Sequence, residues 1–305
     1  ERGARGFTEF GRHVLDEGRP PVYIYDRLDE PTRSILEGEL CEAEGGGCCV
    51  TFASGMAAIS GAMGSILVPG DEVIAHPVVY GCTHSLLVNW YPKMGFGVQR
   101  VGMNDLDALR AAISDKTRIL YFETPANPTL ELIDIRALRG LVDEVNATRP
   151  EGRELLIFVD NTFATPFCQR PIEHGAHVVL HSLTKNIGGF GTEIGGAVVA
   201  PEWMLAGLLL YRKDFGGILS SKSAWAIMVY GLPTLPLRLK RQQYTADKVA
   251  HWLEAVDGID ALEKLDGETF DGVVFLLEHL LQVEFDAAGL DAEIFKLLFC
   301  RFKEF

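Results

Sequence analysis

The sequence lacks any apolar run that approaches the roughly eighteen residues needed to cross a bilayer. Its first twenty residues are polar and rich in Arg and Gly, so we expect neither a membrane protein nor a cleaved signal peptide. Positive charge is scarce too: 28 Lys and Arg stand against 42 Asp and Glu, a formal net charge of −14 at pH 7. No long block of either sign occurs, which argues against binding to nucleic acid or to an anionic membrane surface.

Cysteine is sparse, and its spacing matches none of the usual metal or disulfide patterns. The chain is far too long to depend on disulfides, and it contains no CxxC pair and no Cys/His metal motif. We therefore predict no metal site and a protein of the reducing cytoplasm. The cysteines are Cys41, Cys48, Cys49, Cys82, Cys168 and Cys300.

Short apolar runs are what the sequence does contain, in an ordinary globular composition of 48% hydrophobic and 23% charged residues. From about residue 48 to residue 200 these runs alternate with helical stretches. This pattern predicts an α/β fold whose mainly parallel sheet is covered on both faces. The predicted strands are 49–52, 72–75, 118–122, 155–159, 177–180 and 196–199.

Three regions are predicted along the chain, in line with the two or so domains expected for this length. Residues 1–30 have weak periodicity and several Arg, Gly and Pro, which indicates an extended arm. Residues 31–230 form the α/β domain, in which 104–107 opens one helix and Asp134 caps another. Residues 231–305 are predicted to form a smaller, incomplete C-terminal domain, because apolar residues recur there with helical periodicity.

A lysine flanked by hydroxyl groups directly follows the predicted strand 177–180. The carboxyl end of a buried strand is where α/β sheets place ligands. There Lys185 can form a Schiff base with an aldehyde cofactor, while Ser182 and Thr184 can hydrogen-bond a phosphate. The glycines of 188–191 let the backbone approach a ligand closely. Taken alone, the segment also fits a surface lysine in a turn.

Asp160 is a second candidate, because it ends the very apolar strand 155–159. A buried carboxylate needs a partner, since an unpaired buried charge is costly. The protonated nitrogen of a pyridine ring would be such a partner. Keeping that proton makes the ring an electron sink, as in pyridoxal 5′-phosphate (PLP). An N-cap or turn aspartate fits the segment equally well.

Two further segments each allow a functional and a plain interpretation. Residues 53–58 follow the strand 49–52 and begin a helix of small residues, which predicts an anion site of free N–H groups and the helix dipole. A tight turn is the alternative. Tyr80, in Tyr80-Gly81-Cys82-Thr83, can stack on a planar ring and move protons, or be a core aromatic.

Together and in this order, the four segments resemble the Cys/Met-metabolism family of PLP enzymes, over roughly residues 20–255. The resemblance implies the fold type I, aspartate-aminotransferase-like PLP-dependent transferase fold, with a mainly parallel sheet and a smaller C-terminal domain. It implies PLP as the cofactor, carried by Lys185. The other implied cofactor contacts are Ser182, Thr184 and the backbone of Gly55 and Met56 at the phosphate, Tyr80 stacked on the ring and active in proton transfer, Asp160 at the ring nitrogen, Asn127 near the phenolic oxygen, and Thr162 in the same pocket.

Residues 25–32 resemble a family segment that serves the neighbouring subunit. Tyr25 and Arg27 match a tyrosine and an arginine that reach the phosphate held by the other subunit, whereas Glu30 replaces the usual asparagine before Pro-Thr. The resemblance therefore implies a homo-oligomer, a dimer that shares its active sites and assembles into a tetramer.

Two positions favour the methionine γ-lyases within the family. Cys82 and the pair Lys213–Asp214 match that subgroup and are assigned to the substrate, although a small buried residue and a solvated turn would explain them too. The expected reaction is γ-elimination from methionine or a related sulfur amino acid, giving an α-keto acid, ammonia and a thiol. The alternatives are a γ-replacement enzyme (O-acetylhomoserine sulfhydrylase or cystathionine γ-synthase), a cystathionine γ-lyase, and an inactive homologue that serves as an interaction protein.

The resemblance ends near residue 255. Family members continue into a domain where an arginine, in an Arg-x-Ser-x-Gly setting, binds the substrate carboxylate. Between residues 270 and 305 the only arginine is Arg301, in Cys300-Arg301-Phe302, which does not fit that pattern. The sequence therefore assigns no residue to the substrate carboxylate.

Overall fold

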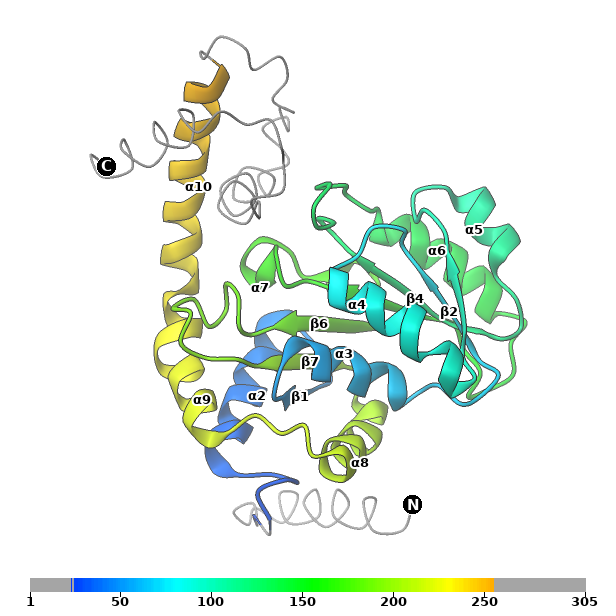
Figure 1. Ribbon diagram of the computed structural model, residues 1–305, viewed down its shortest axis with the longest axis horizontal. Helices are drawn as coiled ribbons and strands as arrows, with labels where there is room; N and C mark the ends of the chain where they lie inside the picture. Colours follow the sequence, from blue (N-terminus) through cyan, green and yellow to red (C-terminus); the bar gives the residue numbers. More distant parts are fainter. Residues whose placement is uncertain (1–22, 24, 255–305) are drawn as a thin grey trace. The chain divides into compact units, whose positions relative to one another are not determined.

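The computed structural model describes residue 23 and residues 25–254 (Figure 1). The rest of the predicted arm, and the residues after Glu254 with Cys300 and Arg301, lie outside the described residues. The chain divides into two compact units at Arg241 and Gln242, and the fold and site below belong to the first unit. The predicted regions 1–30, 31–230 and 231–305 stay a prediction.

The described residues contain one mixed sheet, which confirms the mainly parallel sheet predicted from the sequence. Its strands are β1 (Cys48–Phe52), β2 (Glu72–Ala75), β3 (Gly97–Arg100), β4 (Thr117–Glu123), β5 (Leu156–Asp160), β6 (Val178–Ser182) and β7 (Gly196–Ala200). They lie in the order β1-β7-β6-β5-β4-β2-β3. Strands β3, β2, β4, β5 and β6 are mutually parallel, and β7 runs antiparallel to both of its neighbours.

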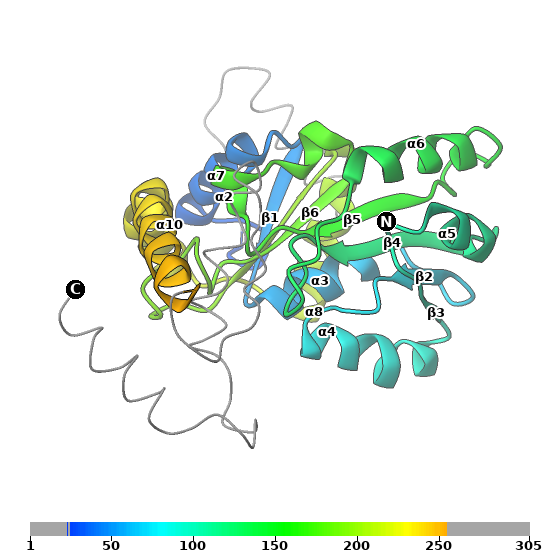
Figure 2. The same cartoon turned by 90° about the horizontal axis from the view of Figure 1, so that it is seen from above.

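Helices cover both faces of this sheet. The α-helices are α2 (Pro31–Glu44), α3 (Gly55–Gly64), α4 (Gly81–Ser85), α5 (Leu106–Ala112), α6 (Ile135–Asn146), α7 (Thr165–Cys168), α8 (Leu205–Phe215), α9 (Ser221–Ala226) and α10 (Leu232–Glu254). Single π-helical turns are η1 (Leu86–Trp90) and η5 (Ile227–Gly231), and short 3-10 helices are η2 (Pro92–Met94), η3 (Pro171–His174) and η4 (Glu202–Met204). Figure 2 shows α2 and α6 on one side of the sheet and α3, α4 and α8 on the other.

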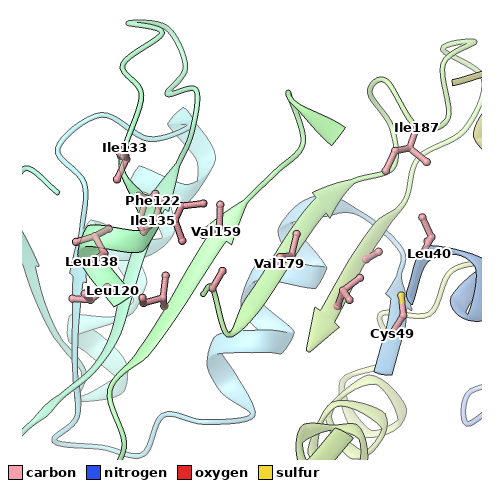
Figure 3. Close-up of a cluster of buried hydrophobic side chains, with 14 of the residues drawn as sticks. Leu40, Cys49, Leu120, Phe122, Ile133, Ile135, Leu138, Val159, Val179 and Ile187 are labelled. Carbon is pink, nitrogen blue, oxygen red and sulfur yellow. The ribbon is translucent and has the colours of Figure 1, made fainter. Parts of the chain in front are cut away.

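The strands are apolar on both faces because both faces are covered. Along β5, Ile157 and Val159 belong to one hydrophobic cluster, and Leu156 and Phe158 belong to the other. All four are buried, and Figure 3 shows Val159 in the first cluster. A polar side chain in this sheet is therefore desolvated and needs a hydrogen-bond partner within the protein.

Local sequence signals fix the starts of α5 and α6. Asp105 caps α5 by accepting from an N–H at 3.0 Å, and Asp134 caps α6 through two N–H groups at 2.9 and 3.0 Å, as predicted. Strand β3 was not predicted. It is a half-exposed edge strand in which Val98 is the one aliphatic side chain, so the apolar-run criterion misses it.

No helix within residues 25–254 combines the length and the apolar character of a membrane span. The same stretch holds no group of three or more His, Cys, Asp or Glu side chains placed to bind a metal ion. Among the described residues, the free thiols are Cys41, Cys48, Cys49, Cys82 and Cys168.

His177 ties β5 to the start of β6. The ring Nδ1 of His177 accepts from the Ile157 N–H at 3.0 Å, and the backbone N–H of His177 donates to the Ile157 carbonyl at 3.0 Å. Burial, and then the nearby positive charge of Arg139, lower the pKa of His177 from 6.5 to about 4. The folded protein therefore holds the neutral ring.

We expect the free energy of unfolding to fall as the pH drops from 6.5 toward about 4. The folded pKa of His177 lies below the unfolded value, so the unfolded chain takes up the proton first. The stability that the neutral ring contributes is thus complete above pH 6.5 and lost on acidification. His177→Asn keeps an acceptor for the Ile157 N–H but does not titrate. On acidification, its free energy of unfolding should therefore fall by up to roughly 3 kcal/mol less than that of the wild type.

Equilibrium urea unfolding of the wild type and of His177→Asn at about pH 7 and pH 4.5 measures the difference. His174→Asn, three residues away in η3, is the matched control and should keep the wild-type pH dependence. The same pH dependence in His177→Asn and in the wild type would show that this ring is not responsible.

Candidate active site

Three parallel strands end in polar residues at one edge of the sheet. Strand β4 ends at Glu123, β5 at Asp160 and β6 at Ser182. Glu123 lies in register with Asp160, and β6 pairs with the other side of β5. Because the strands are parallel, their carboxyl ends lie together. This is the edge where α/β sheets bind ligands.

Asp160 is held by neutral hydrogen-bond donors. Its Oδ1 accepts from the Thr162 N–H at 3.0 Å, and its Oδ2 accepts from the Tyr121 hydroxyl at 3.4 Å. The Thr162 hydroxyl bonds to Asp160 as well and accepts from the Ser182 N–H at 2.7 Å, which joins β5 to β6. Burial raises the pKa of Asp160, and the hydrogen bonds from Thr162 oppose that rise. A cation at this carboxyl would therefore stabilise the site.

Glu123 is a second buried carboxyl, beside Asp160. Its Oε1 accepts from the Tyr80 N–H at 2.6 Å, and its Oε2 accepts from the Asn127 N–H at 3.4 Å. Burial, reinforced by the charge of Asp160, raises the pKa of Glu123 to about 8. The residue thus connects two predicted site residues, Tyr80 and Asn127, to the end of β4.

Backbone donors lie at the start of α3, as expected for an anion site. The Ser54 side chain accepts from the Ala57 N–H at 3.1 Å, and the first-turn N–H groups of Gly55 and Met56 have no partner within the helix. Gly55 packs tightly on Ser182: a Cβ there would lie 2.9 Å from the Ser182 Cβ and 3.1 Å from its Oγ. Glycine is required for this approach, which brings the serine hydroxyl next to the N-terminus of the helix.

Lys185 lies in the turn after β6, where it is exposed. None of the described residues forms a hydrogen bond or ion pair with its ammonium group. The neighbouring Thr184 hydroxyl accepts from the Gly195 N–H at 3.2 Å and donates to the Gly195 carbonyl at 3.4 Å. On the other side, Arg238 of α10 donates to the carbonyls of residues 186 and 187 at 2.7 and 3.4 Å. The turn is therefore fixed around the lysine.

Tyr80 and Cys82 lie at the start of α4. The Tyr80 side chain is exposed, and the Cys82 Sγ lies within hydrogen-bonding distance of its hydroxyl oxygen, at 3.6 Å. The hydrogen bond between the two side chains, and then burial, raise the pKa of Tyr80. Met56 of α3 contacts the same helix, since its Sδ accepts from the Thr83 hydroxyl at 3.8 Å.

Tyr25 and Arg27 form a pair of their own at the surface. Arg27 donates to the Tyr25 hydroxyl at 2.7 Å and lies over its ring. Two fully buried arginines, Arg33 and Arg212, donate to backbone carbonyls of residues 25–28 and hold this turn to the body of the first unit. The pair is thus presented outward on an anchored turn.

Lys213 and Asp214 lie in the last turn of α8 and form an ion pair with each other at 2.8 Å. Within residues 25–254 no hydrogen bond or ion pair joins either residue to Tyr80 or Cys82. Their assignment to the substrate stays a prediction, as do the roles predicted for the other site residues.

The chemistry of the edge fits PLP. The free N–H groups of α3 and the Ser182 hydroxyl suit a phosphate dianion. Asp160, partly buried and bonded by neutral groups, suits a protonated ring nitrogen. Lys185 offers an amine for the aldehyde. Asp160 and Ser182 end the paired strands β5 and β6, Lys185 follows Ser182 in the chain, and Gly55 of α3 packs on Ser182, so the three features lie at one edge of the sheet.

A family model agrees with this fit: residues 7–263 match the one described as Cys/Met metabolism PLP-dependent enzyme. The chain belongs to this family. The family uses PLP, and its members act on amino acids. The match begins and ends beyond the limits of 20–255 inferred from the motifs.

Relatives in the family carry different activities. An L-methionine gamma-lyase of Pseudomonas deceptionensis is 37% identical over 238 residues, which cover 78% of this chain and 58% of that protein. A cystathionine beta-lyase of Lactococcus lactis subsp. cremoris is 36% identical, with 78% and 60% covered. The solved cystathionine gamma-lyase of Lactobacillus plantarum, complexed with L-serine, has a TM-score of 0.73 at 32% identity, with 84% and 65% covered, which confirms the expected fold.

The chain spans about three fifths of the length of the curated relatives it matches. Identities of 36–37% to lyases of different specificity establish the family and leave the reaction to be argued from the site.

Sequence reasoning missed three residues that organise the site: Glu123, Tyr121 and Arg238. Glu123 carried the same signal as Asp160, a carboxylate at the end of an apolar strand, and could have been found by it. Tyr121 reads as one more apolar residue of β4. Arg238 gives no local signal, because the carbonyls it contacts lie about fifty residues earlier in the chain.

Proposed function

We propose that this protein is a PLP-dependent carbon–sulfur lyase of the methionine γ-lyase type. It would convert methionine or a related sulfur amino acid to an α-keto acid, ammonia and a thiol. The observation that carries this proposal is the 3.6 Å contact between the Cys82 thiol and the Tyr80 hydroxyl. Cys82 is one of the two positions that resemble methionine γ-lyases, and it lies against the side chain proposed to protonate the leaving group.

When bound, PLP supplies an aldehyde for the substrate amine and a ring that withdraws electron density from the substrate α carbon. Asp160 would accept a hydrogen bond from the ring nitrogen, and its charge would favour the protonated form of that nitrogen. The Lys185 amine removes the proton from the substrate α carbon. The N–H groups of Gly55 and Met56, with Ser182 and Thr184, anchor the phosphate and so fix the position of the α carbon over the site.

Tyr80 gives a proton to the sulfur that leaves the γ carbon. The hydrogen bond with Cys82 and burial raise the pKa of Tyr80, so the phenol keeps its proton at neutral pH, as an acid must. Asn127 and Thr162 would hold the cofactor near its phenolic oxygen and its ring. A γ-replacement enzyme or a cystathionine γ-lyase would use the same residues in the same roles, so the leaving group and the second substrate distinguish the reactions.

The test is to supply the purified protein and PLP with L-methionine and no second substrate. We expect one methanethiol and one 2-oxobutanoate for each methionine consumed. Lys185→Ala should form neither product, because no other amine replaces the base. Asp160→Asn should lower kcat by on the order of 100-fold, because an amide bonds the ring nitrogen but does not favour its proton by charge.

Gas chromatography of methanethiol and a coupled assay of the keto acid measure both products. Reaction of an activated homoserine with a thiol, with methionine inert, would identify a replacement enzyme instead. No reaction with either, and no PLP bound, would favour the inactive homologue.

We further propose that two subunits complete each other's sites. Tyr25 and Arg27 are exposed, paired with each other and held outward by the buried Arg33 and Arg212. An arginine fork donates two hydrogen bonds to a phosphate and keeps its charge. An isologous dimer would bring each pair to the neighbour's phosphate, and such dimers are the commonest closed assembly.

A mixture of two inactive variants, Arg27→Ala and Lys185→Ala, tests this proposal under conditions of subunit exchange. In a mixed dimer one site carries both lesions and the other carries neither. About a quarter of the wild-type activity should therefore return for random pairing of equal amounts. Exchange followed by mass spectrometry, with no activity regained, would mean that Arg27 does not serve the neighbour's site.

A further inference from the structure

One carboxyl group, that of Glu123, holds two loops of the site. Its Oε1 accepts from the Tyr80 N–H at 2.6 Å, in the segment after β2, and its Oε2 accepts from the Asn127 N–H at 3.4 Å, in the loop after β4. Tyr80 is 44% exposed, so packing constrains its ring only in part. The hydrogen bond from the Tyr80 N–H to Glu123 therefore fixes the backbone position from which the ring extends.

The position of Glu123 is costly for stability. The residue is 5% exposed, and it lies beside a second carboxyl, Asp160. An apolar side chain would avoid the desolvation of an acid, yet it would leave the Tyr80 N–H without its acceptor. A carboxyl in this place thus serves the two loops rather than the core.

We propose that Glu123 is a positioning residue that sets Tyr80 against the ring face and Asn127 against the phenolic oxygen of the cofactor. The inference rests on the proposed function only in requiring PLP at this edge. It does not depend on which amino acid reacts.

The protonation of Glu123 points to an informative variant. Burial and the charge of Asp160 raise the pKa of Glu123 to about 8, so the group carries a proton at neutral pH. A proton on Oε2 weakens only the longer bond, to Asn127, and leaves Oε1 as the acceptor for Tyr80. Glutamine has the same shape and keeps an oxygen at Oε1. Its NH2 group cannot accept from the Asn127 N–H, so Glu123→Gln should keep the hydrogen bond from Tyr80 and lose only the longer one from Asn127.

The experiment compares Glu123→Gln with Glu123→Leu, which has similar bulk and no acceptor. PLP affinity is measured by titration of the apoprotein, and the visible circular dichroism of the bound cofactor reports the asymmetry that a stacked ring imposes. We expect Glu123→Leu to weaken PLP binding about 10- to 100-fold and to reduce the dichroic band, because a buried donor loses its partner. Glu123→Gln should stay within about threefold of the wild type.

A buried carboxyl at the other end of β2 provides the matched control. Asp71 accepts from the Val68 N–H at 2.9 Å and pairs with Arg153 at 2.6 Å. Asp71→Asn and Asp71→Leu should lower Tm and leave PLP affinity unchanged. Equal PLP affinity in Glu123→Leu and the wild type, equal losses in Glu123→Leu and Glu123→Gln, or the same loss in Asp71→Leu would overturn the proposal.

Amide hydrogen exchange in the wild-type protein needs no variant and covers the case in which Glu123→Leu does not fold. The Tyr80 amide should exchange at least about tenfold more slowly than those of Gly81 and Cys82, which lie in the first turn of α4 without intrahelical partners. Equal exchange rates would overturn the proposal. If the PLP-binding results are as expected but the protein does not react with methionine, the lyase assignment is contradicted and the role of Glu123 stands.

Discussion

Desolvation of two carboxyl groups at one sheet edge is the constraint on which this site depends. Glu123 and Asp160 end neighbouring strands whose preceding side chains are buried, so both acids meet a dry environment. Each needs donors, and they find them in the N–H groups of Tyr80, Asn127 and Thr162 and in the Tyr121 hydroxyl. Satisfying the acids therefore brings the surrounding loops to defined places.

Glu123 and Asp160 differ in their hydrogen-bond partners and in what opposes the rise of their pKa. Glu123 meets backbone N–H groups and has its pKa raised to about 8, which favours a neutral, structural role. Burial raises the pKa of Asp160, and the hydrogen bonds from Thr162 oppose that rise. A cationic ring nitrogen would be a further partner for this carboxyl. At one edge of the sheet, Glu123 thus anchors loops and Asp160 can accept a cationic group. Many active sites likewise use different environments to give two acids different pKa values.

The sequence predicted those features that depend on residues close together in the chain. Apolar runs identified six of the strands, and Lys185, Asp160 and Ser182 were found because polar groups directly follow such runs. The edge strand β3 was missed because none of its residues is buried and Val98 is its one aliphatic side chain. The function of Glu123 depends on a loop 43 residues away, and that of Arg238 on a turn 52 residues away. Such pairings follow from sheet order and helix packing, which local patterns do not specify.

The central claim is that PLP binds at this edge with Lys185 as its covalent attachment. Borohydride reduction of the PLP-loaded protein, followed by proteolysis and tandem mass spectrometry, tests it most directly. The reduction converts the imine to a stable secondary amine. The account predicts that the phosphopyridoxyl group is found on Lys185 at close to one per chain, and that the yellow colour is lost. A protein that takes up no PLP, or a modification spread over other lysines with Lys185 unmodified, would contradict it.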